Sequence, residues 1–373
     1  MGQVNNKKRT KIKDIKTGNN KVTLYKNKIN YKFQKNPNLK FRLNKTEDNE
    51  GKQGVNDIFE VFISYKDNKE YLSSSNRNNY NLNIFQLLDN KKILSLKGHK
   101  NSVISIRYFI NQKNYKEEYL ISSDMNYKVI IWDIKNNYNL KILIQTDYTD
   151  NNYIESCLLI FPHNWEKNYI IISKSNIFEN NGILSTRRYS LSNGKYINSI
   201  KESINLSVCY LLSWYNKIEN KYYIIQLALN KIVITDLLED KLYSKLINPK
   251  KNEITINYNN SGFIYTKENK DYLCSSSTSG YINIWDLYNK NLYKFIDTKR
   301  CWLMSIIEWN NKYIIVTDIN GPIKIIDIEN NKIICNIDSL EKGVTCIKKI
   351  NHPFYGESVF IGGENNTIKL WSI

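Results

Sequence analysis

The stretch "KVIIWDI" at residues 128–134 consists mostly of β-branched and aromatic residues and carries Trp132-Asp133 near its end. Runs of this length and composition are typical of β-strands. Two near copies, "YINIWDL" at 281–287 and "TIKLWSI" at 367–373, occur much further along the chain. Three runs of one pattern indicate an internal repeat rather than three unrelated strands.

The repeat extends over most of the chain when each similar run is aligned on the residue that corresponds to Trp132. The spacings between successive aligned residues are 47, 57, 46, 50, 41 and 45. Seven units of similar length are typical of a repeat architecture. The aligned residues are Phe85, Trp132, Tyr189, Thr235, Trp285, Ile326 and Trp371.

Each unit contains further short runs with the composition of strands. An apolar run such as "SVISIRYF" (102–109) comes first, and a run opening on an acid or aromatic, such as "EYLISS" (118–123), follows it. A fourth run such as "KKILSLKGH" (91–99) comes after the run with the Trp-like position. The runs are rich in Ile, Val and Tyr, and no segment has a useful helical period. The sequence therefore predicts an all-β chain with four strands per unit.

These units resemble WD repeats (WD40), the sequence form of the β-propeller. The second unit carries Gly98-His99, Ser122-Ser123 and Trp132-Asp133, the fifth keeps Trp285-Asp286, and the seventh keeps Trp371. The resemblance covers about residues 37–373. It implies a seven-bladed β-propeller of four-stranded antiparallel blades at 37–373. From charge and composition, we expect residues 1–36 to be a basic, disordered tail.

The family's blades are tied by a hydrogen-bonded set of His, Ser, Asp and Trp side chains. By resemblance, His99, Ser122 or Ser123, and Trp132 belong to such a set, with Asn126 in place of the turn acid. An amide accepts a weaker hydrogen bond from imidazole than a carboxylate does. We therefore expect apolar packing between blades to stabilise the ring more than these polar sets.

The last unit ends at its third run, which would leave an unpaired strand edge. The segment "LKFRL" at 39–43 has the alternation of a strand and precedes the first unit. We expect it to pair with residues 367–372 and to close the ring.

The net charge of +18 is concentrated at the N-terminus: residues 1–36 hold ten Lys and one Arg against Asp14, a balance of +10. Three interpretations stay open for this tail. It is a solvated extension enriched in Lys by A/T-rich codons, a segment that attracts nucleic acid, or a myristoylated anchor at Gly2. Asn6 stands where the acylation pattern requires Ser or Thr.

The sequence favours a non-catalytic protein without cofactor or metal. It has three histidines and lacks the His-x-x-x-His, Gly-x-Ser-x-Gly and phosphate-loop motifs. Its six cysteines include no Cys-x-x-Cys pair, so we expect reduced, mostly buried thiols. We find no secretory signal and no run of eighteen apolar residues. The predicted location is intracellular, in cytoplasm or nucleus.

A binding surface is expected on the entry rim, the face where loops lead into the innermost strands. Alignment of the units places Lys100, Tyr153, Arg300 and Trp302 there. Arg, Trp and Tyr dominate protein interfaces, although these aromatics could equally cover the ends of neighbouring strands. The predicted function is a monomeric scaffold that binds other proteins or peptides within a larger complex. The alternatives are a nucleic-acid or ribosome-assembly role through the tail and, third, a membrane-peripheral adaptor through Gly2.

Overall fold

The computed structural model describes the chain in segments, most of them after residue 58. The described residues are 10–17, 20–26, 38–44, 59–75, 80–88, 91–113, 117–126, 128–146, 156–163, 167–173, 185–203, 206–247, 259–298, 302–310, 312–319, 323–337, 344, 346–352, 356–362 and 367–372.

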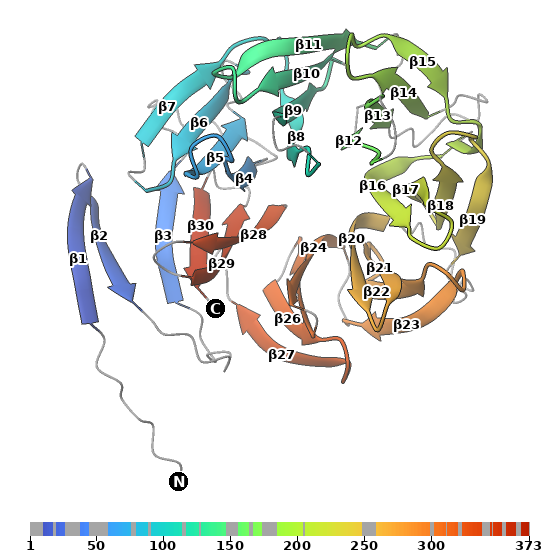
Figure 1. Ribbon diagram of the computed structural model, residues 1–373. Helices are drawn as coiled ribbons and strands as arrows, with labels where there is room; N and C mark the ends of the chain where they lie inside the picture. The colour runs from blue at the N-terminus through green and yellow to red at the C-terminus, as the bar shows by residue number, and fades with distance from the viewer. Residues whose placement is uncertain are drawn as a thin grey trace.

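Seven four-stranded antiparallel sheets, the blades, are arranged in a ring (Figure 1). From the centre outward, blades 1 to 3 are β4 (Phe59–Ile63), β5 (Glu70–Ser75), β6 (Leu82–Gln86), β7 (Lys91–Leu96); β8 (Val103–Ile110), β9 (Glu118–Asp124), β10 (Lys128–Asp133), β11 (Asn139–Gln145); and β12 (Ser156–Ile160), β13 (Tyr169–Ser173), β14 (Thr186–Ser190), β15 (Tyr196–Ser199).

Blades 4 to 7 follow the same order. They are β16 (Val208–Asn216), β17 (Lys221–Ala228), β18 (Lys231–Asp236), β19 (Leu242–Ile247); β20 (Asn259–Lys267), β21 (Lys270–Ser277), β22 (Tyr281–Asp286), β23 (Asn291–Asp297); β24 (Leu303–Asn310), β25 (Tyr313–Asp318), β26 (Ile323–Asp327), β27 (Lys332–Ile337); and β28 (Cys346–His352), β29 (Gly356–Gly362), β30 (Thr367–Ser372), β3 (Asn38–Asn44). The predicted all-β, seven-bladed architecture is confirmed.

The register of the strands confirms the alignment of the seven units. In blades 1 to 6, the pairing of the third with the fourth strand shifts at the Trp-like residue itself, for example between Ile131 and Trp132. In blade 7 the shift lies on β3, opposite Trp371 and Leu370. A bulge bends its strand and increases the local twist, so each blade turns at the same place.

The acid that follows the Trp-like position organises the turn to the fourth strand. One carboxylate oxygen of Asp286 accepts hydrogen bonds from the backbone N–H groups of Tyr288 and Asn289 at 3.0 and 2.8 Å. Asp236 and Asp327 make the same pair of bonds in their blades. The Asp of the Trp-Asp pair is therefore a turn residue, because its short side chain replaces a backbone partner.

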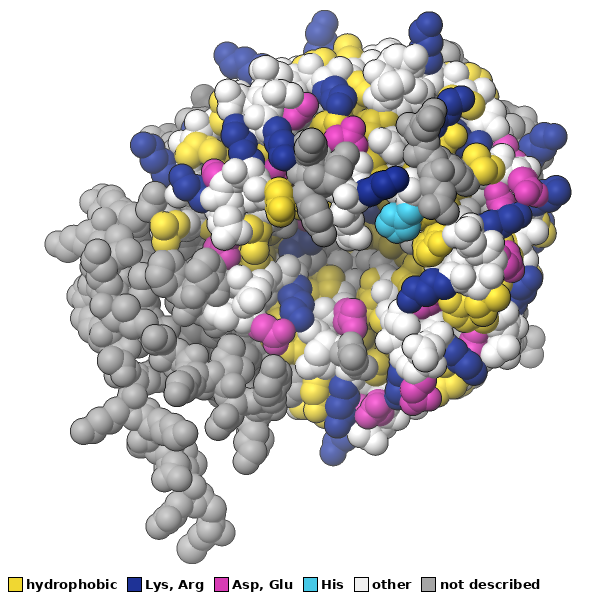
Figure 2. Space-filling view, in the orientation of Figure 1, with side chains coloured by type: hydrophobic (Ala, Val, Ile, Leu, Met, Phe, Trp, Pro, Cys, Tyr) yellow, Lys and Arg dark blue, Asp and Glu magenta, His cyan; other side chains and the backbone are white. Residues whose placement is uncertain are grey.

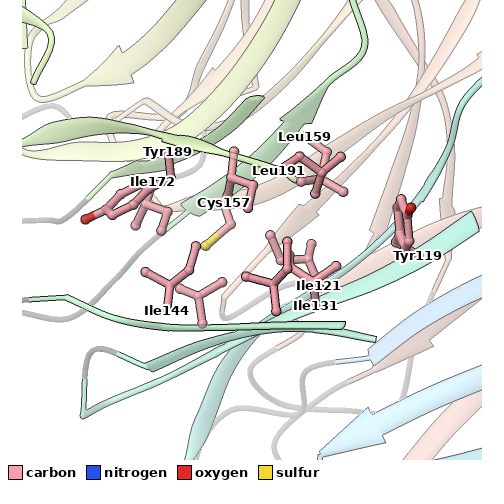
Figure 3. Packing of buried hydrophobic residues seen from close by; sticks show 12 residues of the cluster. Tyr119, Ile121, Ile131, Ile144, Cys157, Leu159, Ile172, Tyr189 and Leu191 are labelled. Carbon is pink, nitrogen blue, oxygen red and sulfur yellow. The ribbon is translucent and has the colours of Figure 1, made fainter. Parts of the chain in front are cut away.

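The hydrophobic core is divided into seven clusters, and each lies between two neighbouring blades. Figure 3 shows the cluster between blades 2 and 3, where Ile144 of blade 2 lies beside Cys157 and Ile172 of blade 3. Burying one such aliphatic side chain contributes about 1.5–3 kcal/mol. The free energy of unfolding therefore depends on a closed ring, because an open blade would expose half of a core.

The ring is closed by strand β3, as the sequence predicted. β3 pairs antiparallel with β30, from Asn38 opposite Ser372 to Asn44 opposite Thr367. A core cluster joins blades 7 and 1 across this seam, with Phe360 and Leu370 packed among residues of blade 1 that include Phe59 and Leu72.

Within the segment that we expected to be a disordered tail, β1 (Thr10–Thr17) and β2 (Asn20–Lys26) pair as an antiparallel hairpin. It forms a separate two-stranded sheet and lies outside the ring (Figure 1). The tail expected at 1–36 therefore contains two described strands, and its disorder otherwise stays a prediction. The Ile, Val, Thr and Tyr content of the two segments favours strand. The domain boundary near residue 37 lies outside the described residues and stays a prediction.

Candidate functional site

Blade 2 contains a complete, buried set of polar side chains. His99 Nδ1 lies 2.8 Å from Asp124 Oδ2, and His99 Nε2 lies 2.7 Å from Ser122 Oγ. Trp132 Nε1 donates to the same Ser122 Oγ at 2.9 Å. An imidazole protonated on Nδ1 satisfies all three groups, because Nδ1–H then donates to the carboxylate while the Ser122 hydroxyl donates to Nε2. The set ties the loop before β8 to strands β9 and β10.

The acid of this set is Asp124, so our assignment of Asn126 to that position was wrong. Strand β9 continues to Asp124. The second carboxylate oxygen of Asp124, Oδ1, accepts hydrogen bonds from the backbone N–H groups of Asn126 and Lys128 at 2.9 and 3.1 Å. Asn126 lies two residues later and accepts from Asn101 Nδ2 at 2.7 Å. The set therefore includes a carboxylate.

Ser122 supplies the hydroxyl, and Ser123 does not, because successive side chains of a strand point to opposite faces. Gly98 is required for close packing beside the set. A Cβ atom at this position would lie 2.9 Å from Ile130 Cδ1 and 3.1 Å from Trp132 Cη2. The contacts of Gly98, His99, Ser122 and Trp132 thus fasten blade 2.

The corresponding sets in blades 5 and 7 are smaller. Trp285 Nε1 donates to Ser275 Oγ at 3.3 Å. Trp371 is buried, and within the described residues its indole N–H has no hydrogen-bond partner. Apolar clusters flank both blades, and the expectation that apolar packing stabilises the ring more than the polar sets stays a prediction.

Trp302 lies on the entry rim, one residue before β24, and is 56% exposed. Its backbone has φ 62°, a left-handed conformation that is strained for a bulky residue. Two hydrogen bonds hold it: Trp302 N–H donates to Thr278 O at 2.7 Å, and Ile319 N–H donates to Trp302 O at 3.2 Å. The indole is therefore presented to solvent by a backbone fixed to blades 5 and 6.

Of the other residues predicted for the entry rim, Lys100 is exposed and lies in the loop that leads into β8. Tyr153 and Arg300 lie outside the described residues, as does Gly2. Their assignments to the rim and to acylation stay predictions.

The centre of the ring is hollowed, and Lys and Arg side chains stand around the rim of the same view with acids among them (Figure 2). Innermost strands carry charged groups that the sequence did not reveal. Lys348 Nζ pairs with Glu60 Oε2 at 2.8 Å across the seam between blades 7 and 1. Burial would lower the pKa of Lys348, but the Glu60 carboxylate outweighs it and leaves that pKa raised.

Arg107 extends from β8 along the same wall of the ring. Its Nη2 donates to Ser156 Oγ at 2.7 Å, and its guanidinium lies 4.1 Å from the ring centroid of Tyr210. These contacts join blades 2, 3 and 4. Lys348, Glu60 and Arg107 are thus engaged with one another or with neighbouring side chains, which suits a structural role.

On the exit rim, where the innermost strands end, buried acids at the start of second strands receive donors from the preceding blade. Glu118 Oε1 accepts from Tyr65 N–H at 2.9 Å, and Asp271 Oδ2 accepts from Trp214 Nε1–H at 3.0 Å. Burial acts to raise the pKa of Asp271, but hydrogen bonds from Thr266, Trp214 and Tyr288 leave it lowered. At the same position of blade 1, burial raises the pKa of Glu70 to about 7.

The described part of the chain offers no evident site for catalysis or metal. Within it, no three His, Cys, Asp or Glu side chains are grouped so as to hold a metal ion. Cys157, Cys274 and Cys335 are buried, while Cys209 and Cys346 are partly buried, and none of these five forms a disulfide within the described residues. Burial raises the pKa of Cys157 to about 12, so this thiol is a poor nucleophile. No helix in the described segments has the length and hydropathy to cross a membrane.

Comparison with known protein families agrees with this geometry. Residues 90–133 match the family model described as WD domain, G-beta repeat. The matched segment covers β7 of blade 1 and β8 to β10 of blade 2, including the complete polar set. No curated protein matches the chain. The chain thus carries a WD40 repeat at residues 90–133 within a seven-bladed β-propeller, and WD40 propellers generally serve as scaffolds for protein interactions.

Proposed function

We propose that this protein is a non-catalytic scaffold that holds partner proteins within a multi-protein complex, and that Trp302 anchors one partner on the entry rim. The observation that carries the proposal is an exposed indole on a strained, hydrogen-bonded backbone. Such strain persists only where the surrounding structure imposes it, and it is common at binding sites.

The chemistry of this rim suits a protein interface. Trp is among the residues that contribute most binding free energy at interfaces. A side chain whose backbone is already fixed loses less conformational entropy on binding. Lys100 supplies a cation on the same rim, and the repeat alignment adds Tyr153 and Arg300. The rim thus combines a rigid aromatic anchor with charged neighbours.

The test is affinity purification from the native cell followed by mass spectrometry, with wild-type protein and Trp302→Gly. Glycine adopts φ 62° without strain, so this variant removes the indole and keeps the backbone. We expect the melting temperature to stay the same or rise, and recovery of at least one partner to fall tenfold or more. Tyr293→Ala, at a 61% exposed aromatic on β23, is the matched control and should lose no partner. Unchanged partner recovery with Trp302→Gly would overturn the proposal.

A second candidate function, favoured by the concentration of charge, is binding of nucleic acid through residues 1–36. This segment carries ten of the chain's lysines, and five of them lie on the β1–β2 hairpin. The test is binding of a labelled single-stranded RNA between 50 and 200 mM salt. Counterion release predicts a steep fall in affinity with salt, and deletion of residues 1–36 should abolish binding. Affinity that survives the deletion argues against this function.

A further inference from the structure

A cavity of about 440 Å³ opens where β4, β8 and β28 end, between blades 7, 1 and 2. This is the exit rim, at the opposite end of the innermost strands from Trp302. At ~3.3 Å per residue, an eight-residue strand such as β24 separates the two rims by roughly 25 Å. The walls of the cavity are mostly apolar and include Phe62, Ile63, Tyr65, Tyr108 and Ile110.

The cavity is built before any partner arrives. Phe62 and Tyr108 stack with their ring centroids 4.8 Å apart. Tyr108 OH donates to Glu118 Oε1 at 3.1 Å, and the backbone N–H groups of Tyr65 and Lys66 donate to the same carboxylate at 2.9 and 3.2 Å. One fully buried acid therefore fixes both the aromatic wall and the turn above it.

Apolar side chains around this cavity remain in contact with solvent. Tyr65 is 57% exposed and Ile63 is 40% exposed. Both remain exposed although the hydrogen bond from Tyr65 N–H to Glu118 holds the turn between β4 and β5 in place. The volume lies within the range of ~300–1,000 Å³ that is usual for ligand pockets. A pocket of this size with an aromatic wall can accept an apolar side chain.

The charges beside the cavity select the occupant. Lys66 Nζ donates to the neutral amide of Asn137 at 2.7 Å, and Lys135 Nζ lies 5.7 Å from the ring centroid of Tyr65. Asp67, the acid in the same turn as Lys66, already accepts a hydrogen bond from Tyr71 OH at 2.6 Å. Two lysines with uncharged partners therefore favour a negatively charged segment next to the apolar pocket.

We propose that this cavity is a second docking site, which takes an apolar side chain from an acidic segment of a partner protein. The proposal rests on the scaffold function above and extends it. With Trp302 on one rim and this pocket on the other, the ring binds two partners at once without competition between them.

The experiment pans phage-displayed random dodecapeptides against the full chain and measures the affinity of the enriched peptides. We expect Leu or Phe flanked by Asp or Glu. Tyr65→Ser and the charge reversal Lys66→Glu should each weaken binding tenfold or more, and 0.5 M salt should weaken it as well. Ile218→Ser, at a 78% exposed side chain in the blade 4 turn, is the matched control and should leave the affinity unchanged.

Three outcomes overturn this inference: no enrichment, enriched peptides without acids, or affinities that Tyr65→Ser leaves unchanged. The result is independent of the entry rim. If the peptides bind Trp302→Gly as tightly as wild type and this variant still recovers every cellular partner, the pocket is supported and the role of Trp302 is rejected. If no peptide binds the pocket but Trp302→Gly loses a cellular partner, the pocket alone is rejected.

Discussion

Blades 2 and 7 have the same strand order and the same register, but different contacts stabilise them. In blade 2, Trp132 donates to Ser122. In blade 2, Trp132 pairs with Leu120, and Ser122 lies two residues after Leu120. In blade 7, Trp371 pairs with Val359, so Ile361 occupies the position of Ser122. The Trp371 N–H is left without a partner among the described residues, and blade 7 gains its fourth strand from the N-terminal part of the chain. The fold therefore requires the register and the apolar seam, while the polar set is an addition.

The largest expected effect comes from removing the strand that completes blade 7. Deletion of residues 1–45 removes β3, exposes the edge of β30 and opens the seam with blade 1. We expect this variant to lose its cooperative thermal transition in scanning calorimetry. Deletion of 1–36 removes only the separate hairpin β1–β2 and should melt like the full chain. Equal melting of both truncations would contradict closure by β3.

The second largest loss of stability is expected on removal of Asp124, the acid of the polar set in blade 2. Asp124→Ala leaves a buried imidazole and two backbone N–H groups without their acceptor. Removing one partner of a buried hydrogen-bonded pair costs about 3 kcal/mol, so the urea midpoint should fall clearly. Asn126→Ala should cost less than about 1 kcal/mol, as expected for an exposed turn residue. Equal costs would mean that Asn126 shares the role of Asp124.

The seam between blades 7 and 1 should also respond to pH through Glu70. Burial raises its pKa to about 7 in the folded state, so between about pH 4.5 and 7 the folded protein binds a proton that the unfolded chain has released. This contribution to stability is present below pH 4.5 and is lost as the pH rises through 7. The loss is on the order of 2–3 kcal/mol.

Urea unfolding of wild type and Glu70→Gln at pH 5, 6 and 7.5 measures this contribution. The stability of the variant relative to wild type should increase with pH across that range. Glu118→Gln is the comparison in blade 2, where the carboxylate accepts three hydrogen bonds, and it should destabilise even at pH 7.5. A difference between wild type and Glu70→Gln that does not change with pH would contradict the raised pKa.

The smallest effect compares the two indoles directly. Trp132→Phe removes a hydrogen bond and leaves the Ser122 hydroxyl with one contact fewer, whereas Trp371→Phe removes an N–H that has no described partner. We expect Trp132→Phe to cost about 1–2 kcal/mol more than Trp371→Phe, because an unsatisfied buried donor is itself unfavourable. Thermal denaturation of both variants measures this difference. Equal losses would show that the indole of blade 7 has a partner.

The sequence predicted the ring because its signals are local and repeated. The Trp-like positions recur once per unit, and the structure places a register shift at each of them. The pairing of 39–43 with 367–372 followed from the cost of an unpaired edge. Asp124 was missed because the length of β9 decides which residue ends the strand, and a two-residue difference cannot be read from composition.

Features made by several blades together could not be predicted in this way. Glu118 was visible only as the first residue of a strand, and its contact with the turn of Tyr65 depends on how two blades lie side by side. The docking pocket combines the ends of β4, β8 and β28, and its lining residues Val61 and Asn351 are 290 residues apart in the sequence. Such sites have no signature within a single unit.

The pairing of β3 with β30 gives the ring a mechanical property. Asn38, the first residue of β3, lies opposite Ser372, the last residue of β30. The chain therefore enters β3 and leaves β30 at the same end of this strand pair. A force that separates the two chain ends breaks the hydrogen bonds between β3 and β30 one after another, in the unzipping geometry, rather than all together in shear. A partner that pulls on both ends could thus unfasten the ring with little force, while the six other blades would resist the same load.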